Sequence, residues 1–114
     1  MLLAIFSIPA VADDVDKWIN DLKDPTSPSV REAAAHALGE LNNSSAVKPL
    51  IEKLTDNKKG VRYEAAVALG NLNNSSAVEQ LIETLKDEDN LTRLATVEAL
   101  GKINNSSALE PLTL

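Results

Sequence analysis

The sequence contains no cysteine, and aromatic residues make up only 3% of its 114 residues. The absence of cysteine excludes disulfides, thiolate metal ligands and a cysteine nucleophile. Because aromatic side chains are so scarce, any core must be built from Leu, Ile, Val and Ala, which suits closely packed helices. The 4 glycines and 5 prolines are few and 25% of residues are charged, so the composition is that of a folded domain.

Positive charge is also in the minority. The 11 lysines and arginines are outnumbered by 17 aspartates and glutamates, which gives a net charge of −6. A surface of this sign repels phosphate groups, and the basic residues form no stripe, so the sequence argues against nucleic-acid binding. The length is that of one domain, large enough to bury a core.

The N-terminal segment lacks charge altogether. Residues 1–11 are mostly apolar, and Ala10-Val11-Ala12 is followed directly by Asp13-Asp14. An apolar stretch that ends in A-x-A before charged residues is typical of a secretory signal peptide, although the usual basic start is missing, and it is too short to span a membrane. We expect residues 1–12 to be the remnant of such a signal and the protein to be exported to the periplasm, cell surface or extracellular space. The alternative is a helix or strand that packs on the first repeat of a cytoplasmic protein.

The most informative feature of the sequence is an internal repeat. Three blocks beginning at Val30, Val61 and Thr92 align when the sequence is shifted by 31 residues, and each ends in A-L-G-x-L or A-L-G-x-I. Each block is followed by Asn-Asn-Ser-Ser-Ala. Repeats of this length indicate a solenoid in which every unit covers the next.

Each unit is predicted to be a pair of helices. Val61, Ala65 and Leu69 fall on one face of the first helix of the second unit, and the second helix follows an i, i+3, i+4, i+7 pattern from Val78. The Asn-Asn-Ser-Ser segment breaks the chain between them. The segment Ser27-Pro28 predicts a helix start. Two capping boxes are also predicted, pairing Ser76 with Glu79 and Ser107 with Glu110.

The repeat domain is expected to span residues 13–114, with a lone helix over 14–23 and pairs over about 29–55, 60–86 and 91–114, the last incomplete. The lone helix corresponds to the second helix of a unit whose first helix is absent, and its Trp18 is expected to pack in the core. Leu114 falls inside the last helix without a polar cap. We therefore expect either further repeats or an end-to-end contact with another chain.

The string V-R-x-x-A-A-x-A-L-G-x-L, followed by A-V-x-x-L-I-x-x-L-x-D, resembles the short HEAT-like repeats of phycobilisome lyases, from Trp18 to Leu112. The resemblance implies an all-α fold, a right-handed α-α superhelix of antiparallel helix pairs. Ankyrin and tetratricopeptide motifs are absent. Such repeats occur in many unrelated proteins, so the resemblance carries little about activity.

A repeated arginine stands near the start of each first helix, with an aspartate in the turn before it. A guanidinium is well suited to bridging a carboxylate and turn carbonyls, and the family pairs such residues structurally. The alternative is a ladder that binds anions. We expect three structural pairs: Asp24 with Arg31, Asp56 with Arg62, and Asp87 with Arg93.

No catalytic, cofactor or metal site is predicted. His36 is the only histidine, and no motif supplies it with further ligands. HEAT-like deoxyhypusine hydroxylases carry His-Glu dyads after the repeat arginine; here only Glu64 remains of them, so the resemblance excludes a di-iron site. The segment Asp87-Glu88-Asp89-Asn90 resembles the start of a calcium loop but lacks its glycine and distant glutamate, and the alternative is an acidic turn that favours the next helix.

The turns also contain acceptor sequences for N-glycosylation, which matter only if the protein is exported. The alternative, which we favour, is that these residues serve as helix-breaking turns and caps. The acceptor asparagines are Asn42, Asn43, Asn73, Asn74, Asn90, Asn104 and Asn105.

With catalysis unsupported, the leading hypothesis is a non-catalytic scaffold that binds another protein on its concave face. The alternatives are a bilin-lyase-like or oxidoreductase-associated HEAT-repeat enzyme or subunit, and a structural segment of a longer surface protein. The resemblance places the second helices on the concave side, where exposed positions vary over a constant core. The candidate contact residues are Lys48, Glu52, Lys53, Glu79, Gln80, Glu83, Thr84 and Glu110.

Overall fold

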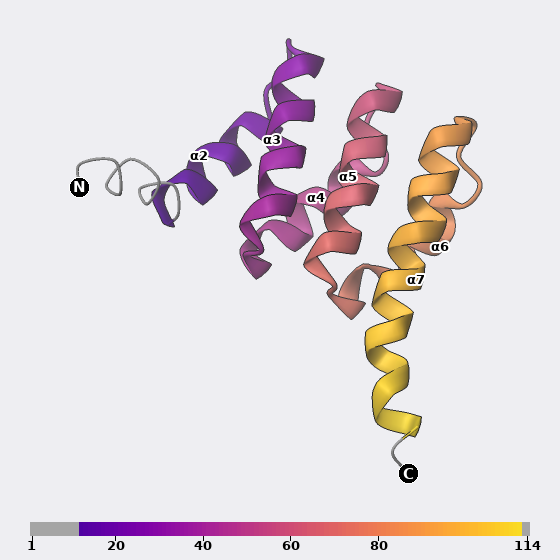
Figure 1. Cartoon of the computed structure of the whole chain (residues 1–114). Helices are drawn as coiled ribbons and strands as arrows, with labels where there is room; N and C mark the ends of the chain where they lie inside the picture. Colours follow the sequence, from indigo (N-terminus) through magenta and orange to yellow (C-terminus); the bar gives the residue numbers. More distant parts are fainter. Residues whose placement is uncertain (1–11, 113–114) are drawn as a thin grey trace, which may run out of the picture.

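The computed structural model describes the backbone of residues 12–112 and the side chains of residues 14–104, and this part of the chain is helical throughout, with short turns (Figure 1). Residues 1–11 of the predicted signal segment, 1–12, lie outside the described residues. The helices are α2 (Ala12–Leu22), α3 (Pro28–Leu41), α4 (Val47–Lys53), α5 (Lys59–Leu72), α6 (Val78–Thr84) and α7 (Asn90–Leu112), with 3-10 turns η1 (Ser44–Ala46) and η2 (Ser75–Ala77).

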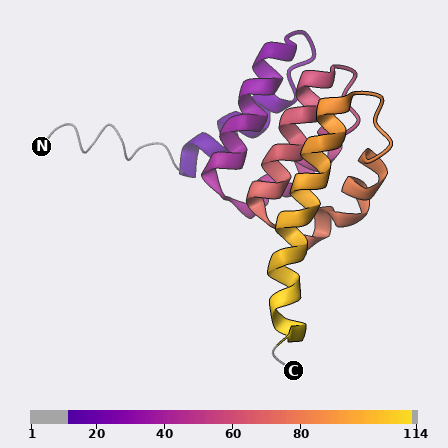
Figure 2. The same cartoon turned by 45° about the vertical axis from the view of Figure 1, so that its right-hand side comes forward.

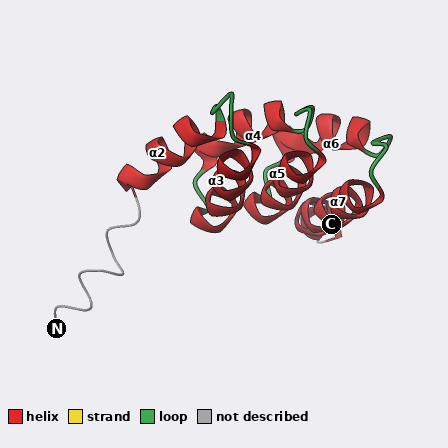
Figure 3. Cartoon of the chain, turned by 90° about the horizontal axis from the view of Figure 1, so that it is seen from above, coloured by secondary structure: helices red, strands yellow, loops and turns green. Residues whose placement is uncertain are grey.

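The helices form two layers (Figure 3). Helices α3, α5 and α7 lie side by side, with α5 packed between the other two, while α4 packs on α5 and α6 on α7. Helix α2 packs on α3 in the same way, and it takes the place of the second helix of a preceding unit. The prediction of an all-α fold built from helix pairs is confirmed.

The turn between the two helices of a unit depends on its two asparagines. Asn42 and Asn73 end α3 and α5 in the left-handed conformation, each with a φ of 54°, which asparagine tolerates better than most residues. The next asparagine caps the 3-10 turn: Asn74 Oδ1 accepts a hydrogen bond of 2.9 Å from the Ser76 backbone N–H, and Asn43 does the same for Ser45.

This geometry corrects one prediction and confirms another. Ser76 lies inside the 3-10 turn, and α6 begins without a side-chain cap, so the predicted box with Glu79 is wrong. Asn74 is the capping residue because the 3-10 turn η2 precedes α6, so the helical segment is capped two residues earlier than the predicted cap, Ser76. Ser27 does cap α3, since its hydroxyl accepts from the Val30 backbone N–H, and Pro28 is the first helical residue.

The third unit differs from the first two. Helix α7 continues through residues 104–107, so the predicted turn is absent and its lower end projects beyond the other helices (Figure 2). Ser107 is therefore inside a helix, and the capping box predicted with Glu110 is wrong. In the earlier units, the helix after the turn packs on the first helix of the next unit.

The core runs between the two layers. Its fully buried large side chains come from all six described α-helices, and Trp18 packs half-buried against it, as predicted. Small residues bring the helices of the α3–α5–α7 layer close together: a Cβ built on Gly39 would lie 2.8 Å from the Ala68 Cα. None of the described helices is long and apolar enough to cross a membrane. The largest fully buried aliphatic side chains are Leu22, Leu38, Leu50, Leu69, Leu81 and Ile103.

Candidate interaction surface

The repeat arginines join consecutive turns into a ladder. Arg62 forms a fork with the Asp87 carboxylate, at 2.7 Å from Nε to Oδ2 and 3.2 Å from Nη2 to Oδ1, while its Nη1 donates to the Asp56 carbonyl. Arg31 repeats the arrangement one unit earlier, with its fork on the Asp56 carboxylate and its Nη1 on the Asp24 carbonyl. Each arginine therefore holds the turn before its helix and the turn after its unit.

The predicted pairing is thus wrong in its register. The aspartate before each arginine supplies a backbone carbonyl, and the carboxylate comes from the aspartate 25 residues later in the chain. Arg93 keeps the first contact, with the Asp87 carbonyl, and its Nη2 donates to Asn90 Oδ1. No carboxylate reaches Arg93 among the side chains that the structure describes.

The ladder is largely shielded from water. The side chains of Arg31 and Asp56 are only 7% and 5% exposed, and those of Arg62 and Asp87 are 11% and 8% exposed. Burial alone raises the pKa of Asp56, but the Arg31 guanidinium and the Lys58 N–H outweigh it and bring the pKa below its usual value. Removing one partner of such a pair costs about 3 to 5 kcal/mol, because the other charge stays buried. The arginines are therefore structural, and their guanidinium edges are occupied.

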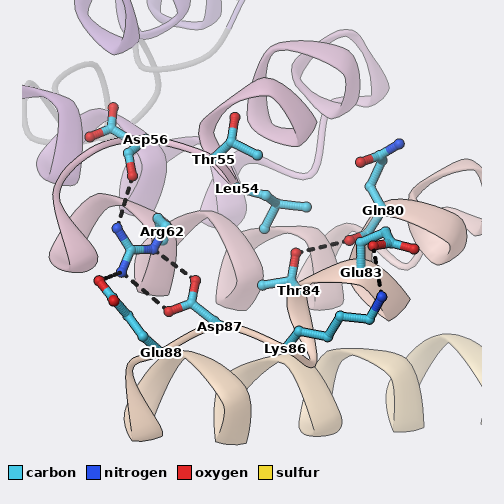
Figure 4. Close-up of a pocket in the computed structure, with 10 residues that line it drawn as sticks. All are labelled: Leu54, Thr55, Asp56, Arg62, Gln80, Glu83, Thr84, Lys86, Asp87 and Glu88. Atoms are coloured by element: carbon cyan, nitrogen blue, oxygen red, sulfur yellow. Dashed lines mark hydrogen bonds and ion pairs between the residues drawn. The ribbon is translucent and has the colours of Figure 1, made fainter.

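An open groove of about 440 Å³ lies between the ends of α4 and α6, with the second pair of the ladder at its floor (Figure 4). Arg62 and Asp87 line it with side chains that are largely shielded from water, and Leu54 adds a buried apolar surface. Its rim is formed by exposed polar side chains, among them Gln80 and Glu83. The groove therefore has a buried, ion-paired floor and an exposed polar rim.

The structure describes the side chains of seven of the eight predicted contact residues. Lys48, Glu52, Glu79, Gln80 and Glu83 are exposed, and Lys53 is half-buried. Of these, Gln80 and Glu83 line the groove together with Thr84. The side chain of Glu110 lies outside the described residues.

Thr84 is the member of this set that the structure corrects. It is only 7% exposed, and its hydroxyl donates to the Gln80 carbonyl at 2.8 Å, so it offers little to a partner. The prediction failed because a threonine in a helix can be either exposed or buried. Its hydroxyl can donate to the backbone carbonyl four residues earlier, which allows the side chain to be buried. Conversely, Lys86 and Glu88 line the groove and were not predicted, because they lie in the turn after α6.

The remaining chemistry candidates are dispersed. The His36 side chain is 63% exposed, with its Nδ1 3.4 Å from a Glu64 carboxylate oxygen. In the acidic turn, Asp87 faces Arg62, while Asp89 caps α7 by accepting from the Thr92 N–H and hydroxyl. Thr92 lowers the pKa of Asp89. Within the described residues, no group of three or more His, Cys, Asp or Glu side chains could hold a metal ion.

The acceptor asparagines of the first two turns already have structural roles. Asn42 and Asn73 are exposed helix ends, while the Oδ1 atoms of Asn43 and Asn74 are engaged in capping. Asn90 is exposed and accepts from Arg93. These contacts account for asparagine at each position without reference to sugars.

No curated protein matches the chain. The family model for HEAT repeats does match, twice, over residues 15–74 and 47–113. These two matches overlap over α4 and α5 and together cover every described repeat. The paired helices, their close packing and the turn-to-turn ladder agree with that match, and the chain belongs to the HEAT-repeat family.

Proposed function

We propose that this HEAT-repeat domain is a non-catalytic scaffold for protein–protein interaction and that the groove between α4 and α6 is its binding surface. The observation that carries the proposal is the contrast between floor and rim. The Arg62–Asp87 pair fixes the floor, while the rim residues Gln80 and Glu83 are exposed. A pre-organised surface loses little conformational entropy on binding, which favours recognition of a partner.

The charge of the groove favours a basic partner segment. Four carboxylates line it against two cations, Arg62 and Lys86. The Asp56 and Asp87 carboxylates are held by Arg31 and Arg62, and the Lys86 Nζ lies 3.4 Å from the Glu83 carboxylate. Glu83 and Glu88 are the exposed acids of the rim, with 67% and 91% of their side chains accessible. Lysine or arginine side chains of a partner would meet complementary charge there, and this complementarity affects orientation and association rate.

The test is a fluorescence-anisotropy titration with a labelled lysine-rich peptide as the probe and a glutamate-rich peptide as its counterpart. The double variant Glu83→Gln/Glu88→Gln removes the rim charge, and Glu40→Gln/Glu98→Gln removes the same charge from exposed positions on the other layer. The rim variant is expected to weaken binding of the basic probe about tenfold, since each exposed ion pair contributes up to about 1 kcal/mol. If both variants lose the same affinity for the basic probe, the effect depends only on the net charge of the protein, and this result would contradict the proposal.

The enzymatic alternative is a bilin-lyase-like or oxidoreductase-associated protein. It requires a pocket with converging polar groups that binds a bilin or a metal. Absorbance titrations with a bilin and with divalent metal ions test it: saturable binding would replace the scaffold proposal with the enzymatic one. We expect no saturable change.

We also propose that the protein is exported. The support is the A-x-A sequence at Ala10–Ala12 followed by two aspartates. Cleavage after Ala12 would leave nearly all of α2 intact, because that helix begins at the same residue. Mass spectrometry of protein from its native cell is expected to find Asp13 at the N-terminus, and an intact Met1 would contradict export. Unshifted masses of peptides that contain the acceptor asparagines would exclude glycosylation.

A further inference from the structure

A second open groove, of about 620 Å³, lies between the ends of α2 and α4, one unit before the α4–α6 groove. Helices α2, α4 and α6 follow one another in the same layer (Figure 3), and Asp56 lines both grooves, so the two are neighbours. The Arg31–Asp56 pair lies on the floor of the α2–α4 groove, as Arg62–Asp87 does in the α4–α6 groove. The two grooves therefore share one architecture and can be compared position by position.

The α2–α4 groove carries an excess of positive charge. Four cations line it against two carboxylates. One of these carboxylates, that of Asp56, is shared by two of the cations, with its Oδ2 2.9 Å from the Arg31 Nε and 3.9 Å from the Lys53 Nζ. The other two cations, Lys23 and Lys58, are exposed and form no ion pair with a described side chain. Their ammonium groups are therefore open to a partner.

The opposite charges of the two grooves come from positions that are equivalent in the repeat, 31 residues apart. In each of three equivalent pairs, the change from the first unit to the second removes a positive charge, adds a negative one, or does both. The pairs are Lys53 and Thr84, Asn57 and Glu88, and Lys58 and Asp89. Because the ion pair on the floor is the same in both units, the side chains around it determine the sign of each groove.

We propose that the α2–α4 groove binds acidic side chains of the partner segment whose basic side chains bind in the α4–α6 groove. This inference rests on the proposed scaffold function and defines the charge pattern of the partner. Complementary charge at both grooves orients the segment and disfavours segments that carry charge of one sign only.

The spacing of the grooves sets the spacing of the charges in the partner. Helices in contact lie about 8 to 10 Å apart, and the two grooves are separated by one such step along the layer. An extended chain rises about 3.3 Å per residue, so the centres of the acidic and basic blocks of an extended partner are expected about three residues apart.

A fluorescence-anisotropy titration with two labelled peptides of the same composition tests the charge pattern. The block peptide has about three glutamates followed by about three lysines, and the mixed peptide alternates the same residues. The block peptide is expected to bind about tenfold more tightly, because only its charges match both grooves at once. Equal affinities would overturn the inference. The proposed function would survive that result if the lysine-rich peptide still responded to Glu83→Gln/Glu88→Gln, and both would fail if no peptide bound.

Removal of charge tests the α2–α4 groove itself. Lys23→Gln/Lys58→Gln removes its two exposed cations, and Lys48→Gln/Lys102→Gln removes the same charge from exposed positions that line neither groove. The groove variant is expected to bind the block peptide about tenfold more weakly and the lysine-rich peptide at least as tightly as the unmodified chain. Equal losses in the groove and control variants, or full affinity of the groove variant for the block peptide, would refute the assignment of acidic side chains to this groove.

Discussion

Gly70 and Gly101 occupy the same position in consecutive repeats, and their replacement with alanine is predicted to change stability in opposite directions. Both lie inside helices and both substitutions remove a flexible residue, so helix propensity contributes the same gain of about 0.5 to 1 kcal/mol in each case. The two positions differ only in what surrounds the added methyl group.

A Cβ on Gly101 meets nothing within 4 Å among the described residues, but at Gly70 the new Cβ would lie 2.8 Å from the Ala99 Cα and 2.9 Å from its Cβ. Carbon atoms pack best at about 3.5 to 4.0 Å, so α5 and α7 would have to separate by several tenths of an ångström. The atoms in contact belong to a helix backbone and to the shortest side chain, and neither can rotate away. Such overpacking costs about 1 to 3 kcal/mol. The net expectation is a loss of about 1 to 2 kcal/mol for Gly70→Ala and a gain of about 0.5 to 1 kcal/mol for Gly101→Ala.

Urea unfolding followed by circular dichroism measures both, at concentrations low enough to keep the chain monomeric. The difference of about 1.5 to 3 kcal/mol corresponds to a separation of roughly 10 °C in melting temperature for a chain of this size. Gly39→Ala, which meets Ala68 at the same distances, should match Gly70→Ala. If Gly70→Ala proves as stable as Gly101→Ala, the close approach of α5 and α7 is wrong, and with it the packing described above.

Three further predictions concern the ladder and the turns. Arg62→Ala is expected to destabilise the fold by about 3 to 5 kcal/mol in urea unfolding, because it leaves Asp87 buried without its cation; a similar cost for Arg93→Ala would contradict this assignment. The pKa values of Asp24, Asp56 and Asp89 are lowered in the folded state, so these groups stabilise the fold above the unfolded pKa of about 4, and this stabilisation is lost as pH falls below that value. Thermal melts from pH 7 to pH 2 should show the loss of stability, and the loss should be smaller in Asp56→Asn. Asn42→Ala should cost about 1 kcal/mol more than Asn42→Gly, because residue 42 has a φ of 54°, and equal melting temperatures would exclude the left-handed turn.

The architecture could be predicted from sequence because the repeat supplies three independent copies of the same pattern. The positions of Leu38, Leu69 and the intervening Asn-Asn-Ser-Ser segments determine helix faces and turns together, and the helix pairs of the first two units follow from them. The helix faces and turns depend on residues that are close in sequence, so the sequence was sufficient to predict them.

What failed depends on contacts between units. Asp56 precedes Arg62 by six residues and was assigned to it, but its carboxylate meets Arg31, which packs beside it from the previous unit. Similarly, the turn predicted after Ile103 has the same local sequence as the others, yet α7 continues through it. In both cases the local sequence permits two outcomes, and for Asp56 the neighbouring unit decides between them.

The central claim is that the α4–α6 groove is where this scaffold holds another protein. The most direct measurement is site-specific photo-crosslinking in the native cell, with the crosslinker at Gln80 on the groove rim and, in a matched variant, at His36 on the other layer. We predict a discrete protein adduct from Gln80 that disappears in the Glu83→Gln/Glu88→Gln background and is absent from His36. Equal adducts at both positions, or an adduct from Gln80 that survives loss of the rim charges, would contradict this account.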